Sequence, residues 1–375
     1  MAAILPGATI GILGGGQLGR MTAMAARSLG YEVSILDPDP GCAAAGVAGK
    51  VLTAPFDDPA AAAELARGSA VVTYEIERIA AVCLRAASAL APVRPSPEVL
   101  EIVQDRGRQK RWLVERGFPV VPFRELATAA EALSALAELR GPLRLKAREG
   151  GYDGRSQWRL PDAAAVPAVV RDGVPCVAEV EVDLANELSV LVARRPAGEV
   201  AVFPVAENWH SDGILSVSVL PGSLPAPIVE KASELARAIA EALAIEGLLA
   251  VEFFQTRSGE LLVNELSPRP HNTFHAAETA CMTSQFEQLV RAVCDLPLGS
   301  TRVLRPTALA NLLGDLWLGP SPPALDRALS LPGVRLHLYG KAPRRGRKIG
   351  HLLAVAETSE AAVELVREAR RRLEG

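Results

Sequence analysis

The segment GILGGGQLGR, residues 11–20, constrains the fold of this chain most strongly. Its glycines Gly14, Gly16 and Gly19 match G-x-G-x-x-G, with an apolar stretch before them and an apolar helical pattern after them. A strand, glycine turn and helix of this kind is typical of a parallel sheet that binds a dinucleotide. The next strand candidate, YEVSILD, ends in Asp37, where a ribose-binding carboxylate would stand. Taken alone, the segment indicates an NAD-dependent dehydrogenase.

Length and composition narrow the class of protein. A chain of 375 residues with 49% apolar residues is expected to form two or three domains with sizeable cores. The net charge of −3 argues against a protein that binds nucleic acids or acidic membranes through its overall charge. No apolar run reaches the roughly 18 residues of a membrane helix, and the N-terminus lacks a signal-like pattern. Five cysteines without a C-x-x-C pair favour a reducing cytoplasm.

The pattern along the chain changes twice. Up to about residue 97, the strand candidates TIGILG, EVSILD, AVVTYE and ALAPVRP alternate with helical stretches, which predicts a half-sized Rossmann-like domain. Next come a helix predicted over 96–117, a strand-like segment over 177–190 and an amphipathic helix over 227–247. Beyond residue 300 the stretches are short, and the chain closes on a helix over 359–374.

The most informative feature is a hairpin predicted over 248–268, LLAVEFFQTRSGELLVNELSP. With a two-residue turn at Ser258-Gly259, Glu252 faces Glu265, and the two carboxylates share one face roughly 5 Å apart. Because opposed like charges are destabilising, a divalent cation such as Mg²⁺ is a natural compensation. The alternatives are two solvated glutamates or a register displaced by one residue.

Two further segments carry groups suited to a nucleotide. In LRLKAREGGYDGRSQ, residues 143–157, Lys146 precedes a glycine-rich loop that could close over phosphate oxygens, or could be a plain surface turn. The motif G-x-x-x-x-G-K-[ST] does not occur in the chain. In VAEVEVDLANELSV, residues 177–190, Glu179, Glu181 and Glu187 lie on or just beyond an alternating strand, which by itself reads as a half-solvated edge.

Two polar clusters favour an anionic substrate. NELSPRPHNTFH, residues 264–275, places four polar side chains beside Glu265, on a loop that two prolines keep from forming a helix. These four are Arg269, His271, Asn272 and His275. YGKAPRRGRKIGH, residues 339–351, gathers five cations, which form either a solvated loop or a phosphate site. The five are Lys341, Arg344, Arg345, Arg347 and Lys348.

Together these segments resemble the ATP-grasp enzymes. The order is GGGQLGR, TYEIE, Arg106 and Lys110, Lys146, GGYDGRSQ, NWHSDGI, NELSPRPHN and GRKIGH, and it runs from Ile10 to about His351. Among ATP-grasp enzymes the chain is most similar to the 5-(carboxyamino)imidazole ribonucleotide synthase family, the biotin-independent, ATP-dependent carboxylases of purine biosynthesis. One departure is Ser156, where that family usually has glycine.

The resemblance implies an α/β ATP-grasp fold. It comprises a Rossmann-like domain over 1–97, an ATP-grasp domain over 98–298 with a lid at about 120–190, and a small C-terminal domain over 299–375 that carries the substrate-phosphate loop. In this family the glycine loop near residue 15 has lost dinucleotide binding and faces the substrate cleft.

The resemblance also implies roles for matching positions. Glu252 and Glu265 match magnesium ligands, and Arg269, Asp153 and Tyr152 match catalytic positions, with Arg269 holding bicarbonate. The implied ATP-binding residues are Arg106, Lys146, Gly151, Tyr152, Asp153, Gly154, Arg155, Ser156, Gln157, Glu179, Val180, Glu181, Val182, Glu187, His210, Asn264 and Glu265. The implied substrate-binding residues are Gln17, Glu75, Tyr152, Asp153, Arg155, His271, Asn272, Lys341, Arg347 and Lys348.

The implied function is carboxylation of 5-aminoimidazole ribonucleotide with bicarbonate, through carboxyphosphate, giving ADP and phosphate. The expected enzyme is a carbon–nitrogen ligase that uses ATP and two Mg²⁺ ions without biotin, as a cytoplasmic homodimer that binds neither nucleic acid nor membrane. Two alternatives remain: a dehydrogenase, which leaves the opposed glutamates unexplained, and a non-catalytic nucleotide-binding regulator, which leaves the intact acid pair without a role.

Overall fold

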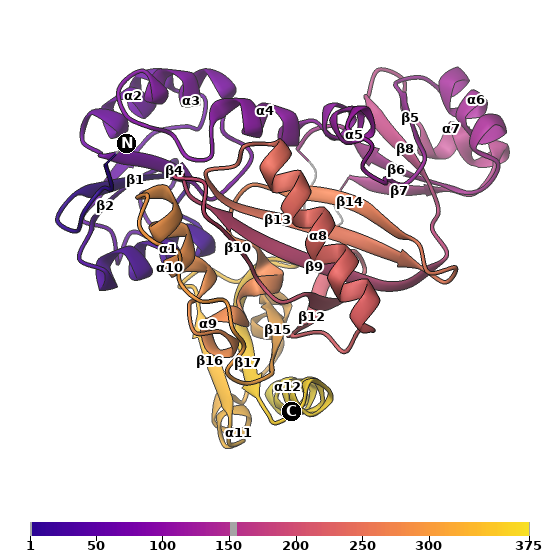
Figure 1. Ribbon diagram of the computed structural model, residues 1–375. Coiled ribbons are helices and arrows are strands. Elements are labelled where there is room, and N and C mark those ends of the chain that lie inside the picture. Colours follow the sequence, from indigo (N-terminus) through magenta and orange to yellow (C-terminus); the bar gives the residue numbers. More distant parts are fainter. Residues whose placement is uncertain (1, 151–155, 375) are drawn as a thin grey trace.

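The structure is a computed structural model that describes residues 2–150 and 156–374. The described residues form three sheets. Figure 1 shows the large central sheet in the middle, with the N-terminal sheet to its left and the lid sheet to its right. The predicted α/β class is confirmed. Within the described residues, no helix is long and apolar enough to cross a membrane.

The N-terminal unit is a parallel sheet in the order β3-β2-β1-β4 with helices packed on it. Its elements are β1 (Thr9–Leu13), α1 (Gln17–Ser28), β2 (Glu32–Asp37), β3 (Lys50–Thr53), α2 (Pro59–Arg67), β4 (Val71–Tyr74) and α3 (Ala81–Ser88). Strand β3 was not predicted because its four residues, KVLT, show no clear apolar pattern. The predicted strand ALAPVRP is wrong: it contributes only an isolated bridge between Val93 and Val72, since its prolines cannot donate to a ladder.

The helix predicted over 96–117 is two helices, α4 (Pro97–Gln104) and α5 (Arg106–Glu115). The chain breaks at Asp105, which has extended backbone angles and caps α5 by accepting a hydrogen bond from the Arg108 N–H at 2.9 Å. Aspartate favours this position because its short side chain satisfies an otherwise unpaired N–H group. The break makes Arg106 the first residue of α5, with Lys110 one turn further along the same helix.

The lid is a small antiparallel sheet in the order β5-β8-β6-β7 with helices on one face (Figure 1). Its elements are β5 (Phe123–Leu126), α6 (Ala129–Leu139), β6 (Leu143–Ala147), β7 (Gln157–Leu160), α7 (Val166–Val169) and β8 (Cys176–Val180). The segment predicted as one strand over 177–190 is divided: β8 ends in the lid, and β9 (Leu184–Arg194) belongs to the central sheet. Residues 181–183 therefore connect the two.

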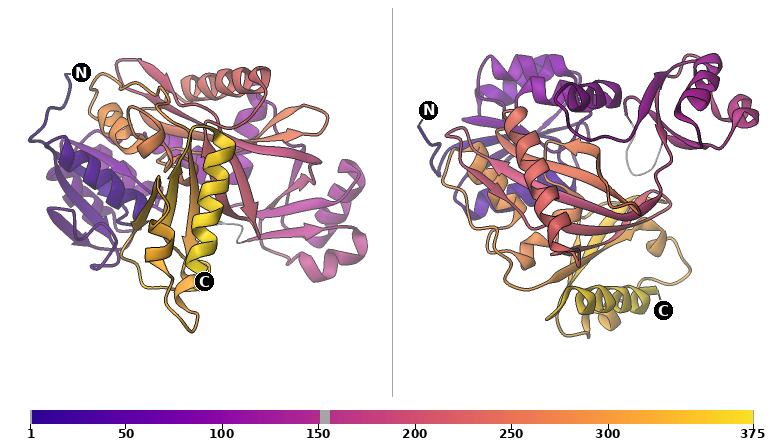
Figure 2. Two further views of the ribbon diagram at one scale, coloured as in Figure 1. Left: turned by 90° about the horizontal axis from the view of Figure 1, so that it is seen from below. Right: turned by 45° about the vertical axis from the view of Figure 1, so that its right-hand side comes forward.

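The central sheet continues into the C-terminal part of the chain, with β14-β13-β9-β11-β12 followed by β15-β17-β16. The other elements are β10 (Val200–Val202), β11 (Ala206–Ser211), β12 (Ile214–Leu220), α8 (Ala226–Ala242), β13 (Gly247–Thr256), β14 (Leu261–Ser267), α9 (Ala277–Ala280), α10 (Gln285–Val293), β15 (Thr307–Leu313), α11 (Leu325–Leu329), β16 (Val334–Leu338), β17 (Lys348–Val355) and α12 (Ser359–Glu374). Helix α8 buries its apolar stripe on the sheet, and α12 covers the C-terminal strands (Figure 2). The domain boundaries at 97 and 298 stay predictions.

Candidate active site

A cleft of about 2170 Å³ lies where the N-terminal sheet, the lid, the central sheet and the C-terminal loop meet. Every described residue that the sequence assigned to ATP, substrate or metal lines this cleft, except Ser156. Gly151, Tyr152, Asp153, Gly154 and Arg155 fall outside the described residues. His275, which the sequence grouped with Arg269 and His271, does not line the cleft, and its side chain is fully buried.

The acid pair of the predicted hairpin is confirmed: Glu252 on β13 faces Glu265 on β14. The predicted two-residue turn is wrong. Thr256 N–H donates to the Glu260 carbonyl at 2.9 Å, so three residues form the turn, and Gly259 supplies the left-handed conformation with φ +88°. A β-bulge beside Glu252 shifts the register back by one residue. The extra turn residue and the bulge compensate for each other. Counting from a two-residue turn therefore also pairs Glu252 with Glu265.

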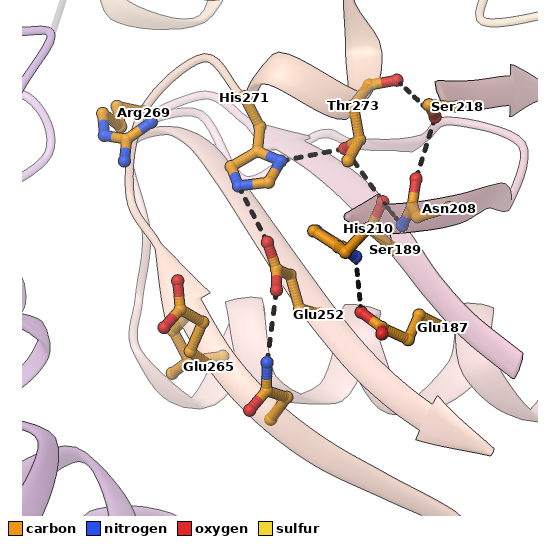
Figure 3. Close-up of polar contacts among 12 residues, drawn as sticks. Glu187, Ser189, Asn208, His210, Ser218, Glu252, Glu265, Arg269, His271 and Thr273 are labelled. Carbon is orange, nitrogen blue, oxygen red and sulfur yellow. Dashed lines mark hydrogen bonds and ion pairs between the residues drawn. The ribbon is translucent and has the colours of Figure 1, made fainter. Parts of the chain in front are cut away.

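The bulge brings Asn264 to the acid pair, because two residues of β14 then oppose one residue of β13. Asn264 Nδ2 donates to Glu252 Oε2 at 3.2 Å, and Asn264 Oδ1 accepts from Lys146 Nζ at 2.9 Å. On its other oxygen, Glu252 contacts His271 Nε2 at 3.1 Å (Figure 3). Burial alone would raise the Glu252 pKa, but His271, His210 and Asn264 outweigh burial and lower it to about 2.

A buried hydrogen-bond network orients His271 from behind. His271 Nδ1 lies 2.8 Å from Thr273 Oγ1, and Ser189 Oγ donates to the same hydroxyl at 2.9 Å (Figure 3). Asn208 and Ser218 extend the network across β11 and β12. A fully connected buried network of this kind fixes a ring orientation, so His271 presents Nε2 to Glu252.

Two lysines and one glutamate form a buried charge cluster under the lid. Glu179 on β8 contacts Lys110 Nζ at 3.1 Å and Lys146 Nζ at 2.8 Å, and the Glu179 and Lys110 side chains are each 2% exposed. Burial would raise the Glu179 pKa, but the two lysines outweigh it and lower the pKa to about 2. The cluster holds the Lys146 side chain at the cleft wall.

A second pair stands further along the same wall. His210 Nδ1 on β11 lies 2.6 Å from Glu187 Oε2 on β9 (Figure 3). Burial would lower the His210 pKa, but Glu187 outweighs burial and raises it. The two residues that the sequence assigned to ATP are thus adjacent in space, 23 positions apart in the chain.

Arginines surround the acid pair. Arg106 Nη2 lies 3.5 Å from Glu265 Oε2, and its Nη1 donates to the Ala147 carbonyl at 3.0 Å. Arg269 Nε pairs with Glu77 Oε1 at 2.7 Å, its Nη1 donates to the Pro270 carbonyl, and its largely buried side chain lines the cleft. Glu77 was not assigned a role from the sequence, although it stands in the TYEIE motif.

The glycine loop of the N-terminal unit is occupied by the protein's own carboxylates. Gly16 N–H and Gly19 N–H donate to Glu75 at 2.5 and 2.7 Å, and Gly15 N–H donates to Asp37 at 2.7 Å. A Cβ atom on Gly16 would lie 2.4 Å from Glu75 Oε1, so glycine there admits Glu75. The N–H groups that bind a pyrophosphate in a dinucleotide fold are therefore already paired.

Three parts of the chain meet at one edge of the cleft. Gln17 Nε2 donates to Asn272 Oδ1 at 3.0 Å, and Lys341 Nζ donates to Gln17 Oε1. The five cations of residues 341–348 all line the cleft. Lys348 opens β17 and is largely buried, so this cluster is not simply a solvated loop.

The sequence did not predict the contacts that join the start of α5 to Arg148, just before the glycine-rich segment. Arg148 pairs with Asp105 through Nη2 at 2.5 Å, and the Arg148 carbonyl accepts from Arg106 N–H at 2.9 Å. The only sequence signal is an aspartate between two helical stretches. At the other end of the loop, Ser156 has φ +66°, a left-handed conformation that glycine adopts without cost.

Protein-family models match three successive segments of the chain. Three family models match: a ribonucleotide synthetase preATP-grasp domain over residues 7–104, an ATP-grasp domain over 111–286, and a phosphoribosylaminoimidazole carboxylase C-terminal domain over 307–365. The N5-carboxyaminoimidazole ribonucleotide synthase of Brucella melitensis is 43% identical over 355 residues, covering 93% of this chain and 97% of that protein.

Two crystal structures are similar over nearly the whole length. An ADP complex of an N5-carboxyaminoimidazole ribonucleotide synthetase has a TM-score of 0.94 and 40% identity, covering 100% of both chains. The synthase of Aspergillus clavatus, in complex with ADP and 5-aminoimidazole ribonucleotide, has a TM-score of 0.90 and 30% identity, covering 98% of each chain.

Fold, cleft and family models together define an ATP-grasp enzyme, a ligase that uses ATP. Within that class, the chain belongs to the N5-carboxyaminoimidazole ribonucleotide synthase family.

Proposed function

We propose that the cleft carboxylates the 5-amino group of 5-aminoimidazole ribonucleotide with bicarbonate and ATP, through carboxyphosphate. The observation that carries this proposal is that two sets of cationic side chains line the cleft that holds the acid pair. Lys146 contacts Asn264 and Arg106 contacts Glu265 beside the pair, and the cations at 341–348 line the same cleft. One cleft can therefore hold two phosphorylated molecules.

Glu252 and Glu265 suit Mg²⁺ because their four carboxylate oxygens are hard donors, with the Asn264 amide beside them. Together the two carboxylates would hold two Mg²⁺ ions, and the bound ions would neutralise the charge of the transferred phosphoryl group. No donor in this set is a sulfur, which fits a hard cation.

The chain's own residues then account for binding and orientation. Lys146 and Arg106 contact ATP phosphates, the backbone of residues 179–182 contacts adenine, and Glu187 takes the ribose hydroxyls. Arg269, fixed by Glu77, orients bicarbonate so that one oxygen attacks the γ-phosphorus and ADP leaves.

Carboxyphosphate then breaks its carbon–oxygen bond to give CO₂ and phosphate. The amine nitrogen of the ribonucleotide attacks the carbon and loses a proton, and the product is the N-carboxylated ribonucleotide. Arg269 stabilises the departing phosphate oxyanion. Residues 151–155, with Tyr152 and Asp153, keep the role that the resemblance implies, closing over the reactants and excluding water.

We also propose that the enzyme is a cytoplasmic homodimer without biotin, on the resemblance to its family alone.

Isotope transfer tests the carboxyphosphate step. Bicarbonate labelled with heavy oxygen should deliver one labelled oxygen to inorganic phosphate in each turnover that carboxylates the ribonucleotide. Mass spectrometry of the phosphate measures this. Product formation with unlabelled phosphate would contradict the attack of bicarbonate on ATP.

A further inference from the structure

Two histidines and a glutamate form a cluster of side chains that do not line the cleft. His337 on β16 and His351 on β17 are direct cross-strand neighbours, and Glu278 lies on α9. One ligand atom from each of the three lies within 4.8 Å of the other two. Glu278 Oε2 and His337 Nε2 are 3.9 Å apart. This donor set differs from the acid pair in the cleft, because it contains two imidazole nitrogens.

Polar atoms of this cluster are buried without hydrogen-bond partners. They include His351 Nε2 and Glu278 Oε2, and His351 is 0% exposed. Asn311, which faces His351 across β15 and β17, also has a buried unpaired oxygen. A buried polar group without a partner destabilises the folded protein, so a ligand that coordinates two of them offsets that cost.

We propose that Glu278, His337 and His351 bind a divalent transition-metal ion of the Zn²⁺ type, with a fourth position open to water. Two imidazoles and one carboxylate are a donor set that suits Zn²⁺, whereas Mg²⁺ prefers oxygen donors throughout.

The surroundings of His351 favour a metal ligand. Tyr339 Oη lies 2.5 Å from His351 Nδ1. When Nδ1–H donates to that oxygen, Nε2 carries the ring's lone pair and is the coordinating atom, as outer hydrogen bonds arrange at metal sites.

Binding requires one movement. The His337 and His351 rings are stacked, with centroids 4.7 Å apart and an interplanar angle of 9°. Imidazole nitrogens coordinate in the plane of the ring, so His337 must turn out of the stack. Its side chain is 27% exposed and can do so, and the same exposure gives an ion a path from solvent.

The ion would tie α9 to β16 and β17. Tyr339 and Lys341 follow β16, and Lys348 opens β17, so the tie supports the loop that carries the cleft cations. The role is structural, separate from the reaction in the cleft.

The test uses the full-length chain carrying Glu252→Gln and Glu265→Gln, which removes the proposed cleft metal site. After chelator treatment, Zn²⁺ is titrated by calorimetry and Co²⁺ by visible absorption, with Mg²⁺ present in millimolar excess. We expect one equivalent to bind, with the intense absorption bands of low-coordinate Co²⁺.

His337→Gln should weaken Zn²⁺ binding at least tenfold and change the Co²⁺ spectrum. Glu278→Gln is the second variant, should His337→Gln prove misfolded in a thermal melt. The matched control is Glu287→Gln on α10, whose side chain is 31% exposed, as is that of Glu278. Absence of binding, or equal affinity in the His337→Gln, Glu278→Gln and control proteins, overturns the proposal.

Discussion

Replacing Glu179 with glutamine tests the buried charge cluster under the lid. Glu179→Gln keeps the shape of the side chain and removes the charge that pairs with both Lys110 and Lys146. The Glu179 pKa lies at about 2 instead of 4.5. That difference of about 2.5 corresponds to roughly 3 kcal/mol. Removing one partner of a buried ion pair typically costs about 3–5 kcal/mol, which is close to the energy that the pKa of Glu179 implies.

Urea denaturation at neutral pH, followed by tryptophan fluorescence, should therefore show a free energy of unfolding about 3 kcal/mol lower in Glu179→Gln. Trp112 lies on α5, which the cluster joins to β6 and β8, and Trp158 lies on β7, which pairs with β6. The control is Glu181→Gln, which loses only the partly exposed pairs with Arg144 and Arg159 and should cost about 1 kcal/mol or less. Equal destabilisation by the two variants would refute the reasoning.

The pH dependence has a definite sign. Because the folded pKa of Glu179 is depressed, its contribution is present above the ordinary pKa of 4.5 and is lost as pH falls toward about 2. The stability difference between the wild-type protein and Glu179→Gln should shrink over that window. A difference that stays constant down to acidic pH would contradict the assigned cause.

Three other predictions follow from the cleft. Glu265→Gln should lower turnover by orders of magnitude in a folded protein; near-normal turnover would contradict the metal assignment. Lys348→Ala should raise KM for 5-aminoimidazole ribonucleotide about ten- to hundredfold, since a charge-assisted contact contributes roughly 1.5–3 kcal/mol, and should leave KM for ATP unchanged; a rise in both would assign the loop to the nucleotide instead. Calorimetry should detect no NAD or NADP binding at millimolar concentration, because Glu75 and Asp37 already pair the loop N–H groups, whereas micromolar binding would revive a dinucleotide site.

The local pattern of the sequence predicted the acid pair because a hairpin has a period of two and a short turn. It could not predict the three-residue turn or the bulge, and therefore missed that Asn264 joins Glu252. A simple period of two carries no signal for an extra residue in one strand or for the length of the turn.

Long-range pairing explains the other differences. Nothing local in the alternating segment 177–190 indicates that it leaves one sheet at Val180 and enters another at Leu184. The glycine loop matches a dinucleotide site in sequence, and only the fold shows that Glu75, directly after β4 and 56 or more residues further along the chain, accepts hydrogen bonds from the loop. His275 stands among cleft residues in the sequence, yet its ring faces the core.

The most direct test of the proposed function is ATP hydrolysis in bicarbonate buffer, measured with and without 5-aminoimidazole ribonucleotide. Two sets of cationic side chains in the cleft that holds the acid pair predict strong stimulation by that ribonucleotide, with ADP and carboxylated product formed in equal amounts. Glycinamide ribonucleotide, the substrate of related ATP-grasp enzymes, should stimulate little. Hydrolysis that ignores 5-aminoimidazole ribonucleotide, or responds better to glycinamide ribonucleotide, would contradict the proposed substrate.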